Sequence, residues 1–374
     1  MAITYNQQPS GRLGANSPLI YQVSDAANSG TAGFYYNFDI YVWSGSTTTP
    51  ATPIATLTKL PDTYASSRAY IDIHRIVTQY ISLNAFVFGT LQPTIGTGAY
   101  WVLIKTSGYN TASGASPISA IVDSNRILVT RGYSYTIDGI DAAYTNKVYT
   151  DRTSILLNTD CTMDYLWYDA SVVTSIQIGA ATYYPTAGTT SSLSIQGIEL
   201  REALNLALLW GTNTQITFVA ASGNVVIPIT FECPNKYGNT TTLFLNKYGV
   251  WEGMTWNGVS QANVSVTKEN YESALFVGAN MTTQWTYGMR QKKNFNINTK
   301  KTLNVNTNWI PESAVESMVQ FTSSEAILIC DGTDYYAANV IDSQVEVKKA
   351  TNIKLIQYTM QLEYSQPLIN KIVR

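Results

Sequence analysis

The sequence is poor in charge and in the side chains that most often perform catalysis. Its 374 residues include one histidine, His74, and only 13% of them are charged, against 12% that are aromatic. Soluble domains typically carry about 25% charged residues. Much of the solubility must therefore come from Ser, Thr, Asn, Gln and Tyr. This composition favours a β-rich binding or assembly surface over an active site.

Other absences narrow the class of protein further. The longest apolar stretches, such as Ala326 to Cys330, are strand length, far short of the roughly 20 residues needed to cross a bilayer. The formal net charge is −2, without a basic block, so no electrostatic footprint for nucleic acid or anionic lipid is evident. Residues 1–10 lack a basic segment followed by an apolar one. The sequence predicts no membrane span and synthesis without a signal peptide.

The cysteines do not form a recognisable framework. Cys161, Cys233 and Cys330 are odd in number and far apart in the sequence, which matches neither a disulfide scaffold nor a paired-cysteine metal site. We expect them to be small buried hydrophobic residues in a reducing cytosol. The sequence therefore predicts no metal and no cofactor.

Alternation of apolar and polar residues with period two dominates the chain. Runs rich in β-branched and aromatic residues include Phe34 to Trp43, Ile216 to Ala220 and Ile353 to Tyr364, and clusters of Gly, Ser, Thr and Asn separate such runs. The pattern predicts a mainly β protein of tandem immunoglobulin-like or fibronectin III-like β-sandwiches, followed by a C-terminal β-rich domain.

Three short segments have helical spacing instead, and each is too short to be stable alone, so we expect it to cap a sandwich. They lie at 71–81, where a strand is expected to lead into a helix of two to three turns, at 199–209 and at 311–321, the last with Pro311 at its first helical position. Together with the strand runs they predict three units, at 1–120, 121–215 and 216–374.

Two local signals describe the last unit. Asp331-Gly332 separates two apolar runs and is the strongest hairpin signal in the chain. Residues 353–364 largely alternate, with Ile353, Leu355, Ile356, Tyr358, Met360, Leu362 and Tyr364 as the apolar members. We expect this segment to form one long strand in the centre of a small antiparallel sheet.

The residues capable of catalysis are sparse and badly spaced for it. His74, between Asp72 and Arg75, lacks a recognisable nucleophile motif and is expected to serve as a capping or surface residue. Among the carboxylates, Asp160, Asp164 and Asp169 fall close together, which raises a calcium site or an acid pair as alternatives. Their spacing does not match a calcium-binding loop. The sequence predicts a protein that is not an enzyme.

The most motif-like segment lies in the third unit. It begins at Cys233 to Tyr237, continues through Leu243-Phe244-Leu245-Asn246 and ends at Gly249-Val250-Trp251-Glu252, with Trp256 following. Trp251, Trp256 and the later Trp309 are large apolar side chains that either join the core or anchor an interface. They are the candidate interface anchors of the chain.

This segment resembles a motif of virion structural proteins of tailed phages, especially crAss-like and other phages of Bacteroidetes hosts. Two further pieces are similar to the same group: the strand Phe38 to Val42 with its closing Ile71 to Val77, and the helix entry Asn306 to Glu312. Together they cover most of the chain in the expected order. The sequence departs from the commoner Gly-Gly-Trp/Phe-Asp form, because it has Val250 and Glu252.

The resemblance implies a non-enzymatic subunit of a phage tail, neck or baseplate. Such a subunit would assemble with copies of itself into a ring and contact neighbouring virion proteins. It would be made in the host bacterial cytoplasm and act in the virion. The alternative is a receptor-binding or head-decorating protein that recognises host surface glycan through exposed Tyr and Trp. In that case Tyr35-Tyr36, Tyr183-Tyr184 and Tyr335-Tyr336 would each contribute one surface ring, because adjacent strand residues face opposite sides.

Overall fold

The structure is a computed structural model. The protein is mainly β with short helices, as predicted. It describes residues 3–62, 67–83, 88–95, 98–111, 116–133, 146–159, 163–186, 188, 190–232, 238–272, 291–307, 309–311, 314–331, 334–341, 355–366 and 369–372. These residues form three bodies, each with its own hydrophobic core. Within the described residues, no helix is long and apolar enough to span a membrane.

The first body, residues 3–133, is a sandwich of two sheets that share one core. Phe34, Tyr36, Phe38 and Ile40 alternate with less buried residues along one strand and point into this core. The smaller sheet contains β1 (Thr4–Gln7), β3 (Ile20–Ser24) and β6 (Arg68–Asp72); the larger contains β2 (Arg12–Gly14), β9 (Ile127–Thr130), β7 (Ala99–Asn110), β4 (Phe34–Trp43) and β5 (Ala55–Lys59), with β8 (Ser119–Asp123) also beside β7. The predicted strand-to-helix transition is confirmed, because β6 leads into α1 (His74–Tyr80).

The second body, residues 146–232, places a five-stranded sheet against a two-stranded one around a second core. The five strands are β10 (Ile155–Asn158), β16 (Val225–Glu232), β15 (Thr214–Ala220), β12 (Val173–Ile178) and β13 (Ala181–Tyr183); the other two are β11 (Tyr165–Asp169) and β14 (Ile195–Glu199), with α2 (Ser191–Ser194) before β14 and α3 (Leu200–Leu206) after it. The predicted helix within 199–209 is α3, which buries Leu200, Ala203 and Leu204.

Both sequence-based domain boundaries fall inside strands. The boundary between 120 and 121 divides β8, which pairs with β7 of the first body. The boundary between 215 and 216 divides β15, which pairs with β12 and β16 of the second body. The second body therefore extends to residue 232. Strand pairing is a long-range interaction that local composition does not reveal.

The third body, residues 238–372, is an eight-stranded sheet covered on one face by α4 (Val315–Thr322). Its strand order is β18 (Trp251–Trp256), β17 (Thr240–Leu245), β22 (Ile327–Asp331), β23 (Asp334–Val340), β25 (Thr359–Tyr364), β20 (Lys292–Asn306) and β19 (Gln261–Glu272), with β26 (Ile369–Ile372) also beside β20. The predicted hairpin is confirmed, because β22, which ends at Asp331, pairs with β23, which begins at Asp334.

Two predictions for the third body were partly wrong. The helix predicted at 311–321 begins at Val315, because Ile310 and Pro311 instead form a short strand, β21, paired with β24 (Leu355–Ile356). The long strand predicted at 353–364 is divided into β24 and β25. As expected, β25 is central in the sheet, between β23 and β20.

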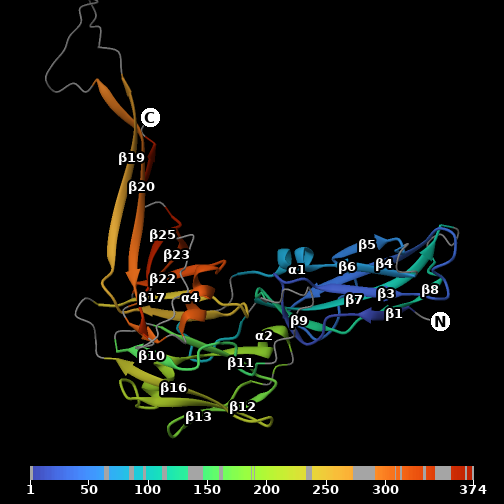
Figure 1. The fold of residues 1–374 in the computed structure, drawn as a ribbon, viewed down its shortest axis with the longest axis horizontal. Helices are drawn as coiled ribbons and strands as arrows, with labels where there is room; N and C mark the ends of the chain where they lie inside the picture. Colours follow the sequence, from blue (N-terminus) through green and yellow to red (C-terminus); the bar gives the residue numbers. More distant parts are fainter. Residues whose placement is uncertain are drawn as a thin grey trace, which may run out of the picture.

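A long ribbon formed by β19 and β20 extends out of the third body (Figure 1). All twelve residues of β19 are exposed, and β19 is an edge strand of the sheet. The first body lies at the opposite end of the molecule from this ribbon in the view of Figure 1.

Candidate functional site: a joint between three bodies

A fourth hydrophobic core lies where the three bodies meet. It joins buried residues from each body: Ile95, Ala99 and Leu128 of the first, Tyr149, Met163, Tyr165, Trp167 and Ile195 of the second, and Leu243, Leu245, Tyr248, Val250, Trp251 and Cys330 of the third. The indole N–H of Trp167 donates to the carbonyl of Trp251 at 2.6 Å, which joins the second and third bodies inside this core. Apolar burial and a buried hydrogen bond thus hold the bodies together.

The turn 246–250 of the third body lies against the other two. Asn246 accepts a bond from its own turn, Tyr248 N–H to Oδ1 at 3.0 Å, while its Nδ2 donates to the Tyr149 carbonyl of the second body at 2.9 Å. On the opposite side, the Tyr133 N–H of the first body donates to the Lys247 carbonyl at 2.7 Å. The turn is therefore bonded to both neighbouring bodies.

Gly249 allows the close approach of this turn to the first body. Its φ is +73°, a conformation that side chains with a Cβ adopt at a cost. A Cβ at this position would lie 2.5 Å from the backbone nitrogen of Gly132 and 2.7 Å from the carbonyl carbon of Arg131. Both of these atoms belong to the backbone and cannot rotate out of the way. Glycine is therefore required here for two independent reasons, the positive φ and the lack of space for a Cβ.

Arg152 joins the second body to the third. Its Nη1 and Nη2 bind Asp164 at 2.7 and 3.0 Å in a two-pronged pair. Its Nε lies 2.9 Å from Oε1 of Glu252 on β18, and its side chain is only 12% exposed. One guanidinium thus balances two buried carboxylates from two bodies.

Glu252 is buried completely among these partners. Burial raises the pKa of its carboxyl group, while the charge of Arg152 and the bonds from Asn246 and Thr150 lower it. The Asn246 Nδ2 bond to Oε2 is 2.8 Å long. Glu252, one of the two residues at which the sequence departs from the commoner motif, is therefore a member of the joint.

Two further arginines join the remaining pairs of bodies. Arg12 of the first body lies 2.6 Å from Asp169 of the second, and it also donates to the hydroxyl of Tyr149. Arg131 of the first body binds Glu325 of the third with Nε at 2.8 Å and with Nη2. Each pair of bodies is thus connected by a different arginine, and we call this whole arrangement the joint.

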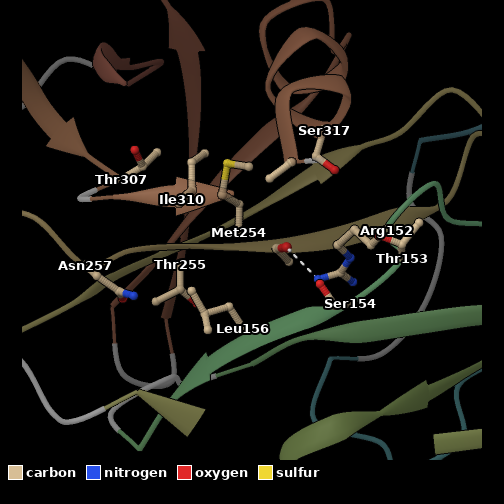
Figure 2. Close-up of a pocket in the computed structure, with 12 residues that line it drawn as sticks. Arg152, Thr153, Ser154, Leu156, Met254, Thr255, Asn257, Thr307, Ile310 and Ser317 are labelled. Carbon is tan, nitrogen blue, oxygen red and sulfur yellow. Dashed lines mark hydrogen bonds between the residues drawn. The ribbon is translucent and has the colours of Figure 1, made fainter. Parts of the chain in front are cut away.

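A small cavity of about 100 Å³ opens beside Arg152, between β10, β18 and the start of α4 (Figure 2). Hydroxyl and amide side chains supply much of its lining, including Ser154, Thr255, Asn257 and Ser317. The guanidinium at its wall is already balanced by Asp164 and Glu252. In the part of the chain that the structure describes, no group of three His, Cys, Asp or Glu side chains is placed to hold a metal ion. The cavity suits ordered water.

The candidate anchors predicted from the sequence differ in their exposure to solvent. Trp251 and Trp256 are buried, at 4% and 0% exposure, so they cannot contact another subunit and the prediction was wrong for both. Trp251 lies in the joint core and Trp256 packs on Phe321 of α4. Trp309 is 58% exposed, and its role as an anchor stays a prediction.

The other residues considered for chemistry have structural partners. His74 begins α1 but does not cap it, and its partly exposed ring has Nδ1 2.9 Å from Asp72, in keeping with the surface role. Asp164 and Asp169 pair with Arg152 and Arg12, and Asp160 lies outside the described residues. Cys330 is buried as expected, whereas Cys161 and Cys233 are outside the described residues.

Sequence reasoning missed the three arginines. The carboxylates that they bind in other bodies lie far along the chain, for example 157 residues from Arg12 to Asp169 and 194 from Arg131 to Glu325. One signal was available in the sequence. Because charged residues are scarce, an arginine in a strand or at a strand end is expected to have a structural role.

Glu199 gives the second body a pH-dependent stability. Burial raises its pKa to about 7, although its side chain accepts backbone bonds at the start of α3. A carboxyl group with a raised folded-state pKa stabilises the fold below its unfolded value near 4.5, and this contribution is lost as pH rises through 7. Between pH 5 and pH 8, we expect Glu199→Gln to lose less stability than the parent, by on the order of 2 to 3 kcal/mol.

Urea unfolding at both pH values measures this difference. Glutamine removes the titration and keeps one acceptor oxygen, but it gives up one of the two backbone bonds that Glu199 accepts at the start of α3, a loss that is the same at both pH values. The matched control is Glu202→Gln, an exposed glutamate on the same helix. The role of Glu199 would be contradicted if both variants showed the same change in stability between the two pH values, relative to the parent.

Comparison with known proteins yields distant structural similarity only. No model of a known protein family matches the chain, and no curated protein matches it. Among solved structures it is similar to the integrin-binding bacterial protein invasin, with 10% identity over 82% of this chain and 57% of that chain, and a TM-score of 0.20. It is also similar to the I9–I11 tandem of titin, with 8% identity over 81% of this chain and 94% of that chain, and a TM-score of 0.15. The chain thus spans little more than half of the invasin chain, and similarity at this level assigns no function.

Proposed function

We propose that this protein is a structural subunit of a tailed-phage virion that assembles with copies of itself into a ring in the tail, neck or baseplate. The observation that carries the proposal is the location of the motif that resembles virion proteins. Its Asn246, Gly249 and Trp251 all belong to the joint. A motif whose residues fix how the three bodies are placed relative to one another suits a structural subunit.

The physical character of the chain supports assembly. Its three bodies are joined by a shared core and by three arginine pairs, so the subunit can transmit a defined geometry to its neighbours. Its low charge and its many Tyr, Asn and Thr residues suit broad, partly hydrated interfaces. In a ring, each copy would use one surface to meet the next. The further partners we propose are neighbouring tail or neck proteins, and the place of action is the virion.

The alternative is recognition of host surface glycan by a receptor-binding or head-decorating protein. Three strongly exposed aromatic residues favour it: Tyr70 at 56%, Tyr184 at 72% and Trp309 at 58%. They belong to three different bodies, however, whereas a sugar ring needs aromatic side chains gathered in one place. Assembly therefore remains the better supported function.

The decisive experiment measures the mass of the purified full chain by light scattering after size exclusion, from low to high micromolar concentration. Electron microscopy of any large species accompanies it. We expect closed rings of a single size. A chain that stays monomeric throughout and binds a defined sugar on a glycan array would overturn the ring and support the alternative.

A further inference from the structure

The outer edge of β19 is the longest open strand edge in the described part of the chain. β19 has twelve residues, all of them exposed, and pairs on one side only, with β20. An open edge presents unpaired backbone N–H and C=O groups that can bind another strand. Proteins usually protect such edges with proline, several charges or short length. β19 contains no proline, and its three charged residues, Lys268, Glu269 and Glu272, all lie in its second half, so that residues 261–267 carry no charge.

The side chains of β19 are also arranged for pairing. Ala262, Val264 and Val266 lie on one face, and Asn263, Ser265 and Thr267 lie on the other. Val264 and Val266 remain 54% and 49% exposed. A strand that faces only water gains nothing from such alternation.

The apolar face of the ribbon continues the core of the third body. Ala262 pairs with Leu303 of β20, and Leu303 belongs to the core beneath α4. Farther along the ribbon, the same face carries Val264 and Val266, which lie beside Lys301 and Thr299 of β20 and have no covering helix. A partner that extended the sheet here would cover the two exposed valines of this face.

We propose that a second copy of this chain completes this edge, with the two β19 strands antiparallel about a two-fold axis at Ser265. The length of the edge selects this partner. Every other edge strand among the described residues has six residues or fewer, as in β18, β5 and β1. Among these strands, only the β19 of a second copy is long enough to pair along the whole edge.

The sequence of β19 is self-complementary in this register. Val264 lies opposite Val266 of the other copy and Asn263 lies opposite Thr267, so apolar side chains meet apolar ones and polar meet polar. Lys268 lies opposite Ala262, which avoids a contact between like charges. The paired segment, 261–269, is about 30 Å long, and it converts two ribbons into one wider sheet.

This pairing extends the proposed assembly function and adds one specific contact to it. Because the contact is isologous, it joins copies two by two, and a ring requires a second, different contact. The two ideas can therefore fail separately.

A cysteine at the two-fold axis tests the register directly. In the full chain carrying Ser265→Cys, the two new thiols lie directly opposite each other, within reach of a disulfide. Oxidised glutathione is expected to convert most of this variant to a covalent dimer. The matched control is Thr267→Cys, on the same face of the same strand, whose two thiols would be about 14 Å apart and beyond disulfide reach. The parent, with its three native cysteines, sets the background.

A charge substitution tests the same contact without cross-linking. The double variant Val264→Lys with Val266→Lys places lysines opposite lysines across the axis and is expected to weaken association at least tenfold by light scattering. Its melting temperature should match the parent, because both side chains are exposed. Val259→Lys, at a valine 61% exposed just before β19, is the control.

The outcomes separate the pairing from the ring. Cross-linking of Ser265→Cys alone supports the pairing, even if no ring is seen by microscopy. Rings without that cross-link, cross-linking of both cysteine variants alike, or full association of the double lysine variant would each overturn the pairing. The ring proposal would be unaffected by those results.

Discussion

Arg152→Met is expected to destabilise the protein by about 3 to 5 kcal/mol at neutral pH, the range found when one partner of a buried ion pair is removed. The guanidinium is the positive charge bound to both Asp164 and Glu252, and all three side chains are largely buried. Methionine fills a similar volume but leaves two carboxylates without that charge. The free energy of unfolding in urea, followed by tryptophan fluorescence, measures the loss.

The dependence of this loss on pH identifies its cause. Because burial raises the pKa of Glu252, removal of Arg152 favours the protonated carboxyl still more. The deficit of Arg152→Met should therefore be smaller at pH 5 than at pH 8. Adding Glu252→Gln to Arg152→Met removes one uncompensated charge and should restore part of the stability.

The matched control is Arg68→Met, at an exposed arginine of β6. Exposed ion pairs contribute about 0 to 1 kcal/mol, so this control should stay within that range. An Arg152→Met variant no less stable than Arg68→Met would contradict the role of Arg152 in the joint.

Gly249→Ala is expected to cost about 2 to 4 kcal/mol. A left-handed backbone conformation in a residue with a Cβ accounts for roughly 1 kcal/mol or more, and the remainder comes from overlap of the new Cβ with the backbone of Arg131 and Gly132. Relief of this overlap requires the turn to move away from the first body. The bonds from Tyr133 to Lys247 and from Thr130 to Tyr248 would then lengthen.

Gly45→Ala separates the two contributions. Gly45 has a φ of +76°, close to that of Gly249, but a Cβ there would meet nothing within 4 Å. This control should lose only the conformational part, about 1 kcal/mol. The same urea titration compares both variants with the parent. Equal losses at the two positions would show that the close approach at the joint costs nothing.

The β-sheet class and the local transitions could be predicted because they depend on neighbouring residues. Alternation in Phe34 to Trp43 predicted β4, and spacing by three and four after Ile73 predicted α1. Adjacent tyrosines also behave as period two requires, since each pair has one more buried member: Tyr36 beside Tyr35, Tyr183 beside Tyr184 and Tyr335 beside Tyr336.

The errors arise where distant residues decide. The pairing of β21 with β24 takes Pro311 out of the helix predicted to start there, and the pairing of β15 with β12 moves a domain boundary. Trp251 and Trp256 were ambiguous in the sequence, because a large apolar side chain suits a core and an interface equally. The structure resolves the ambiguity in favour of cores.

By itself, the sequence determined the mainly β class, the short helices and the scarcity of charge, all of which follow from local periodicity and composition. Only the tertiary structure decided the joint, since Arg12, Arg131 and Arg152 find carboxylates in other bodies across long stretches of chain. It also decided that β19 lies at a sheet edge rather than inside the sheet. The physical reason is common to both: a strand pattern specifies which side chains face inward, but not which strand or which charge will lie beside it.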